Sequence, residues 1–227
     1  MRASGPFGPL FAVAILCLAS PAQAQSGGTL PGRIEVAVGL GVIGSAAFGG
    51  DDASLRAADG ADFRLFGAES RFGGAPALEA RAGVALTRRY AMEVRFALSH
   101  PELLTSISGD VEGAPDIELA ERIDQYVVDA AILVSLDRLR LGPVVPFASA
   151  GAGYLRQLHE GLTLVEEGTA YHVGGGARHR FVSRGRGFLK AVGLRADARV
   201  YLFAGGIAVG NRPRPHAAAT GSVFIAF

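Results

Sequence analysis

The chain has 227 residues, of which 49% are hydrophobic, 19% are charged and 32 are glycine, and its formal net charge is +1. Its mean hydropathy is +0.30, yet beyond the N-terminal segment no run approaches the roughly 18 apolar residues of a membrane helix. These values exclude a collagen, a disordered tail, a disulfide-rich mini-protein, a helical membrane protein and a strongly basic nucleic-acid binder. A glycine-rich β protein that is apolar without being continuously apolar remains.

The N-terminal segment predicts a secretory signal peptide over residues 1–24. An arginine precedes an apolar run from Leu10 to Ala19, and small residues up to Ala24 follow it. A positive start, a short apolar stretch and an A-x-A site are the three parts of such a peptide. We therefore expect export with cleavage after Ala24, which leaves residues 25–227 as the barrel domain. An N-terminal anchor helix is the alternative, and Pro21 disfavours it.

Eight later segments alternate between apolar residues and polar or small ones, as strands with two different faces do. In the clearest of them, large apolar residues from Tyr90 to Leu98 alternate with Ala91, Glu93 and Arg95. Most of the segments have about ten residues, which matches a tilted membrane strand and exceeds the usual length of a soluble strand. The predicted strands are 34–43, 78–86, 90–98, 123–136, 144–157, 169–181, 192–202 and 216–227.

The predicted connections between these strands differ in length. Residues 44–75 and 99–122 are predicted as long loops, whereas 87–89 and 137–143 are short turns. Aromatic residues also gather near both ends of the strands, as they do in the interfacial girdles of a membrane barrel. Long loops at one end and short turns at the other are typical of outer-membrane barrels. The sequence therefore predicts an all-β, eight-stranded antiparallel up-and-down transmembrane β-barrel, located in the outer membrane of a Gram-negative bacterium.

The end of the chain carries a resemblance to a known family. The last residue is Phe227, and Val223 and Ile225 precede it at alternate positions. This ending resembles the C-terminal signal that the barrel-assembly machinery reads, and the segments 146–154, 173–178 and 193–199 are similar to late strands of the small OmpA/OmpX-like barrels. The resemblance implies contact with outer-membrane lipid and with the assembly machinery. It implies no single activity, because that family includes adhesins, stability proteins, narrow pores and a few lipid-modifying enzymes.

If the apolar faces contact lipid, the opposite faces carry charges into the lumen. An eight-stranded barrel is just wide enough to be filled by its own side chains, and buried guanidinium groups require carboxylate partners. We therefore predict a cross-strand ion-pair network that plugs the lumen, with His172 also facing inward. The nearly equal counts of acids and bases favour this plug over an ion pathway. The predicted network comprises Glu35, Glu79, Arg81, Glu93, Arg95, Asp129, Arg178, Arg180, Arg195, Asp197 and Arg199.

Charges outside the predicted strands are segregated, since the long loops are acidic and the short turns are rich in arginine. Acidic loops favour an extracellular partner or a divalent cation, although simple solvation of the loops explains them as well. We expect a barrel that acts through its external loops, in adhesion or another interaction, or in envelope integrity. A narrow pore or small-solute channel is the alternative. Outward apolar stripes disfavour a soluble ligand-binding barrel.

Several motifs suggest catalysis or cofactors but lack the context that these need. Residues 39–44 read G-x-G-x-x-G, yet no helix is predicted after them, so a dinucleotide site is disfavoured. Ser99 and His100 are neighbours, but adjacent strand residues point to opposite faces and no third member of a triad is evident. His172 and His179 also have opposite parity. We therefore expect no enzymatic activity, no cofactor, no metal site and no nucleic-acid partner.

Overall fold

The computed structural model describes residues 33–56, 62–111, 114–160, 164–183, 188–207 and 214–227. The predicted signal peptide lies outside these ranges. The strands are β1 (Ile34–Ile43), β2 (Ala46–Arg56), β3 (Asp62–Phe72), β4 (Ala75–Ala85), β5 (Tyr90–Ser99), β6 (Glu102–Ser108), β7 (Ile117–Arg122), β8 (Asp124–Ser135), β9 (Val144–Leu158), β10 (Val165–Ser183), β11 (Ala191–Gly205) and β12 (Arg214–Ala226). A 3-10 turn, η1 (Asp137–Leu139), lies between β8 and β9. Within the described ranges, no helix is long and apolar enough to cross a membrane.

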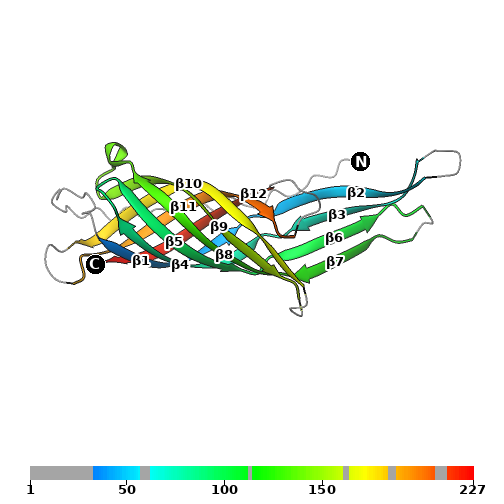
Figure 1. The fold of residues 1–227 in the computed structure, drawn as a ribbon, viewed down its shortest axis with the longest axis horizontal. Coiled ribbons are helices and arrows are strands. Elements are labelled where there is room, and N and C mark those ends of the chain that lie inside the picture. Colours follow the sequence, from blue (N-terminus) through cyan, green and yellow to red (C-terminus); the bar gives the residue numbers. More distant parts are fainter. Residues whose placement is uncertain (1–32, 57–61, 112–113, 161–163, 184–187, 208–213) are drawn as a thin grey trace, which may run out of the picture.

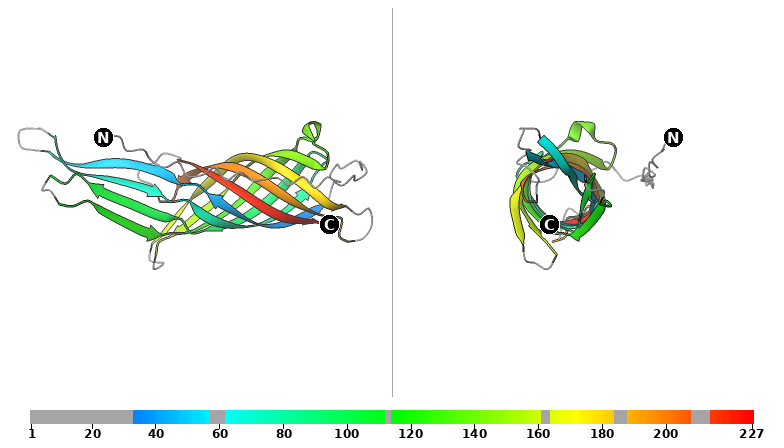
Figure 2. Two further views of the ribbon diagram at one scale, coloured as in Figure 1. Left: turned by 180° about the vertical axis from the view of Figure 1, so that it is seen from behind. Right: turned by 90° about the vertical axis from the view of Figure 1, so that its right-hand side faces the viewer.

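Eight of the strands close into an antiparallel barrel in the order β1-β12-β11-β10-β9-β8-β5-β4 (Figure 1). Strand β1 completes the ring because it pairs with both β12 and β4, so that Val38 lies opposite Val223 on one side and opposite Ala80 on the other. Viewed along its axis, the barrel is a closed ring (Figure 2, right). This arrangement confirms the predicted eight-stranded antiparallel barrel, and each predicted barrel strand overlaps one observed strand.

The prediction that residues 44–75 and 99–122 are loops is wrong. They contain β2, β3, β6 and β7, which form a four-stranded sheet in the order β2-β3-β6-β7. This order matches that of β1, β4, β5 and β8, so the sheet extends about half of the barrel wall beyond one end (Figure 1). We call it the outer sheet. At the junction, backbone hydrogen bonds of 2.8 Å from Gly73 N to Glu102 O and 2.9 Å from Ile123 N to Pro101 O continue the pairing.

Alternate side chains of the barrel strands face outward and are both apolar and exposed. In β1, Val38 is 64% exposed and Leu40 is 72% exposed, and in β10 Val173 is 62% exposed. Their neighbours on the opposite face are buried or half-buried, as the burial pattern of β11 also shows. An apolar band of this extent is unfavourable in water but matches the hydrocarbon core of a bilayer. The outside of the barrel is therefore its lipid-facing surface.

Glycine on the inward face permits close approach between the strands and the lumen side chains. A Cβ atom at Gly153 in β9 would lie 2.1 Å from the carbonyl oxygen of Val128 and 2.4 Å from Cβ of Asp129. At Gly193 in β11, a Cβ atom would lie 2.5 Å from the ring of Phe224. Real side-chain atoms do not approach so closely, so larger residues at these positions require the lumen to repack.

Candidate functional site

The centre of the lumen is a cluster of buried ion pairs around Glu79 of β4. Its carboxylate accepts hydrogen bonds from Arg81 Nε at 3.0 Å, Arg95 Nη1 at 3.3 Å and Arg199 Nη1 at 3.1 Å, and from the hydroxyl of Thr220 at 3.0 Å. These groups come from β4, β5, β11 and β12, so they converge only because the sheet closes. Three guanidinium groups around one carboxylate offset the cost of removing the charges from water.

A second carboxylate, that of Asp197 in β11, pairs with two of these arginines, Arg81 and Arg199, and also with Arg195. It is 2.7 Å from Arg81 Nη1 and 3.2 Å from Arg195 Nε, and it also pairs with Arg199. The side chains of all four residues are at most 3% exposed. Arginine suits this arrangement because its planar fork of donors can serve two carboxylates at once.

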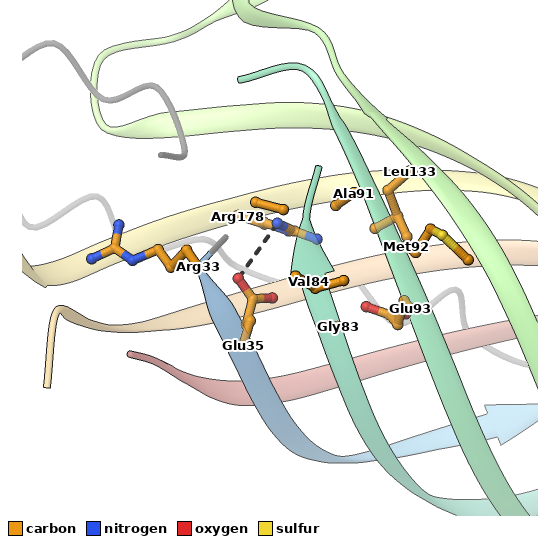
Figure 3. Close-up of a pocket in the computed structure, with 10 residues that line it drawn as sticks. Arg33, Glu35, Gly83, Val84, Ala91, Met92, Glu93, Leu133 and Arg178 are labelled. Carbon is orange, nitrogen blue, oxygen red and sulfur yellow. Dashed lines mark hydrogen bonds and ion pairs between the residues drawn. The ribbon is translucent and has the colours of Figure 1, made fainter. Parts of the chain in front are cut away.

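Towards the short-turn end, the network continues to the mouth of the barrel. Arg195 forms a two-point pair with Glu93, and its guanidinium lies 4.5 Å from the centre of the Phe147 ring. Arg178 also contacts this ring and lies 3.4 Å from Glu35. Figure 3 shows the residues that line a cavity here, among them Glu35, Glu93 and Arg178, and the cavity has a volume of about 20 Å³. That volume is enough for a single water molecule but not for a continuous path.

Towards the opposite end, Arg95 pairs with Asp129 and lies 5.0 Å from the centre of the Tyr201 ring. His172 faces inward beside them, with Nδ1 at 3.8 Å from the Asp129 carboxylate. Most of the predicted lumen residues are thus connected by ion pairs, namely Glu79, Arg81, Glu93, Arg95, Asp129, Arg195, Asp197 and Arg199. Glu35 and Arg178 form a separate pair nearer the mouth. Arg180 lies half-buried at the short-turn end of β10, two positions beyond Arg178.

Two layers above the charges were not predicted from the sequence. The first is an apolar cluster that includes Leu155, Tyr201 and Phe203. The second is a chain of amides in which Gln157 Nε2 donates to Gln125 Oε1 at 2.8 Å, while Gln157 Oε1 accepts from the backbone N–H of Ile207 at 2.8 Å. Gln125 and Gln157 have the parity of inward-facing residues, which was the available signal. Their link to Ile207 ties the connection after β11 across the barrel.

Two histidine–carboxylate contacts lie at the base of the outer sheet. His100 Nδ1 is 2.7 Å from Asp124 Oδ1, and His159 Nδ1 is 2.8 Å from Glu121 Oε1. Ser99 is buried, and its hydroxyl accepts a hydrogen bond of 3.3 Å from Gln125 Nε2. Its hydroxyl therefore has a lumen partner, whereas His100 pairs at the rim. Over the described part of the chain, no three potential metal ligands cluster.

The residues of the predicted C-terminal signal lie at the end of β12. Val223 is 49% exposed and Ile225 is 36% exposed on the lipid-facing side. The centre of the Phe227 ring lies 4.6 Å from that of Phe188, which lies just before β11. Recognition of these residues during assembly stays a prediction.

Comparison with protein-family models and with curated protein sequences found no match. Solved structures do match. The outer membrane protein OprG from Pseudomonas aeruginosa superposes with a TM-score of 0.52 at 11% identity, over 88% of this chain and 98% of that one. The chain has the fold of a small outer-membrane barrel. Two further matches to this barrel are Ail, the attachment invasion locus protein of Yersinia pestis (TM-score 0.41, 9% identity, 87% and 100% covered), and the outer membrane protein AlkL (0.45, 15%, 92% and 97%).

Proposed function

We propose that this chain is a non-enzymatic, non-conducting outer-membrane barrel that acts through its outer sheet, by binding an extracellular partner. The observation that carries the proposal is the side-chain packing of the lumen. Ion pairs occupy its centre, an apolar cluster and the amide chain lie above them, and a cavity of only about 20 Å³ lies at the short-turn mouth. Because side chains fill the barrel interior, we infer that the protein acts through the surface that lies outside the membrane, which is that of the outer sheet.

The outer sheet has properties that favour interaction. It exposes large apolar side chains beyond the barrel, of which Leu55 is 60%, Phe63 is 53% and Leu119 is 57% exposed. A groove of about 480 Å³ is lined by its strands, with Glu69 and Glu118 among the lining residues. Exposed apolar residues beside acidic ones are typical of an interaction surface rather than of a solvated loop.

Planar-bilayer recording tests whether the lumen conducts. We expect no reproducible current steps from the purified chain, because its arginines and carboxylates neutralise one another in a packed interior. The double variant Arg81→Ala/Arg195→Ala, which removes two central guanidiniums, is the matched comparison for an opened lumen. Reproducible steps from the unaltered chain would instead support the alternative of a narrow pore.

Replacing β2–β3 and β6–β7 by short turns tests the role of the outer sheet. Cells displaying this shortened barrel are compared with cells displaying the full chain, both for adherence to surfaces and to one another and for entry of a dye through the envelope. We expect adherence to fall while dye entry stays unchanged. Greater dye entry with equal adherence would favour a role in envelope integrity instead.

Absence of catalysis is part of the proposal and has its own assay. The hydroxyl of Ser99 is held by Gln125 in the lumen, whereas His100 pairs with Asp124 at the rim, so the nucleophile and base of a hydrolase are not aligned. We expect the purified barrel to release no fatty acid from phospholipid vesicles. Release that disappears in the His100→Ala variant would contradict the proposal.

A further inference from the structure

Two neighbouring turns at the short-turn end concentrate exposed arginines. The turn between β4 and β5 carries Arg88 and Arg89, and the connection between β8 and β9 carries Arg138 and Arg140. A backbone hydrogen bond of 2.8 Å from Ser135 N to Arg89 O joins the two. The second connection forms the small coil at the upper left of Figure 1. We call these residues the arginine turns.

Local hydrogen bonds give the arginine turns a defined shape. The Thr87 hydroxyl accepts from the backbone N–H groups of Arg89 at 3.1 Å and Tyr90 at 3.0 Å. In the second turn, Arg140 Nε donates to the carbonyl oxygen of Gly142 at 2.7 Å. Gly142 has a φ of +59°, in the left-handed region that favours glycine. The arginines are therefore presented on ordered turns rather than on loose chain.

Apolar side chains on the same turns place them at the boundary of the membrane. Leu139 is 63% exposed, Leu141 is 75% exposed, and Leu86 and Tyr90 are each 48% exposed. Leucines that alternate with Arg138 and Arg140 suit a position where acyl chains meet headgroups. In outer-membrane barrels, short turns lie on the periplasmic side, where the leaflet consists of phospholipid.

We propose that the arginine turns bind the phosphate headgroups of anionic phospholipids. The proposal rests on the membrane barrel proposed above. Guanidinium groups contact phosphate oxygens through two parallel hydrogen bonds, and this recognition is strongest for anionic lipids. The only acid in these turns is Asp137, so the local charge is positive. The outer sheet at the opposite end carries acidic residues, which repel anionic lipid. Attraction of anionic headgroups is therefore expected at the short-turn end alone.

Electron spin resonance of spin-labelled lipid measures this preference directly. The full chain is reconstituted in phosphatidylcholine bilayers with spin-labelled phosphatidylglycerol or phosphatidylcholine, and the fraction of motionally restricted probe is compared. We expect a preference of about fivefold for phosphatidylglycerol over phosphatidylcholine at low salt. This is the effect of the attraction between a single basic side chain and an anionic lipid surface. This preference should fall as salt screens the exposed charges.

The variant Arg88→Gln/Arg89→Gln/Arg138→Gln/Arg140→Gln should bind both probes equally. The matched control neutralises four exposed arginines of the other end, Arg56→Gln/Arg64→Gln/Arg71→Gln/Arg122→Gln, and should keep the preference. Equal restriction of both probes by the unaltered chain would overturn this inference alone. No restricted lipid with either probe would overturn the membrane barrel itself. Heat-modifiable migration of each variant verifies that it has folded.

Discussion

At the scale of single residues, the lumen arginines depend on carboxylates from several strands. Arg195 illustrates this, because it pairs with Glu93 of β5 and Asp197 of its own strand while its guanidinium lies over Phe147 of β9. It is 2% exposed. Removing one partner of such a cluster leaves buried charge without compensation, which costs more than the cluster contributes as a whole.

Arg195→Ala should therefore lower the free energy of unfolding by about 3 kcal/mol or more, measured by urea titration of the barrel in detergent. Arg122→Ala is the control, since its side chain is 63% exposed and its nitrogen lies 4.0 Å from Asp124. That change should cost less than about 1 kcal/mol. Equal midpoints for both variants would contradict the assignment of Arg195 to the lumen network.

The inward glycines yield a second prediction at this scale. Gly153→Ala introduces a methyl group beside the Val128 carbonyl and should lower the melting temperature in detergent. Gly221→Ala in β12 is the control, because a Cβ atom there has no neighbour within 4 Å. The two variants add the same atoms, so a similar melting temperature for both would show that lumen space is not limiting.

At the scale of elements, short junctions let barrel strands continue into the outer sheet. The sheet retains the order of the strands below it, and Phe72, Ile123, Leu103 and Ile207 pack together where sheet and barrel meet. Ile207 comes from the connection after β11, so this cluster joins opposite sides of the barrel. The amide chain through Gln157 reinforces the same join.

Gln157→Ala should accelerate hydrogen exchange at the Ile207 amide, because the acceptor of that N–H is removed. Gln125→Ala is the matched comparison, since it breaks the amide chain but leaves the bond between Gln157 and Ile207. Exchange followed by NMR in detergent should distinguish them, with a large increase only in the first variant. An equal increase in both would mean that the chain acts as one unit.

At the scale of the whole molecule, closure satisfies every strand edge within the membrane. A barrel is one of the few forms that can span a bilayer, because lipid offers no partners for backbone polar groups. Here the closing contacts are those between β1 and β12, from Glu35 opposite Ala226 to Ile43 opposite Ala218.

This closure predicts heat-modifiable migration. The unboiled chain should resist the detergent of a denaturing gel and migrate differently from the boiled chain. A chain that lacks β12 should show no such difference, because β1 and β11 would then be left as open edges. Removing β2–β3 and β6–β7 should preserve it, since those strands take no part in the ring. Loss of the shift in that shortened chain would mean that the outer sheet is needed for closure.

The alternation of apolar with polar or small residues along single strands was enough to predict most of the barrel strands and the residues that face the lumen. From Tyr90 to Leu98, for example, the lipid-facing and inward residues follow from a period of two, because a membrane barrel exposes one face to hydrocarbon. The inward set, including Glu79, Arg95 and Asp197, could therefore be predicted. Their partners could not, because ion pairs across a lumen depend on register and tilt that no single strand specifies.

The outer sheet is the part that only the tertiary structure decided. The pairing of β2 with β3 contains two register shifts, one of them in β2 between Ala47 and Gly49, and Gly49 has a φ of +86°, so the side chains of β2 do not alternate regularly. It forms a strand because β3 pairs with it and because both strands continue from barrel strands, β1 and β4, that are already paired. By itself the sequence determined a barrel with a charged interior, because the alternation that indicates both can be read within each strand. Contacts between distant segments decided that the acidic connections are an ordered sheet, since pairing energy appears only when neighbouring strands are already in place.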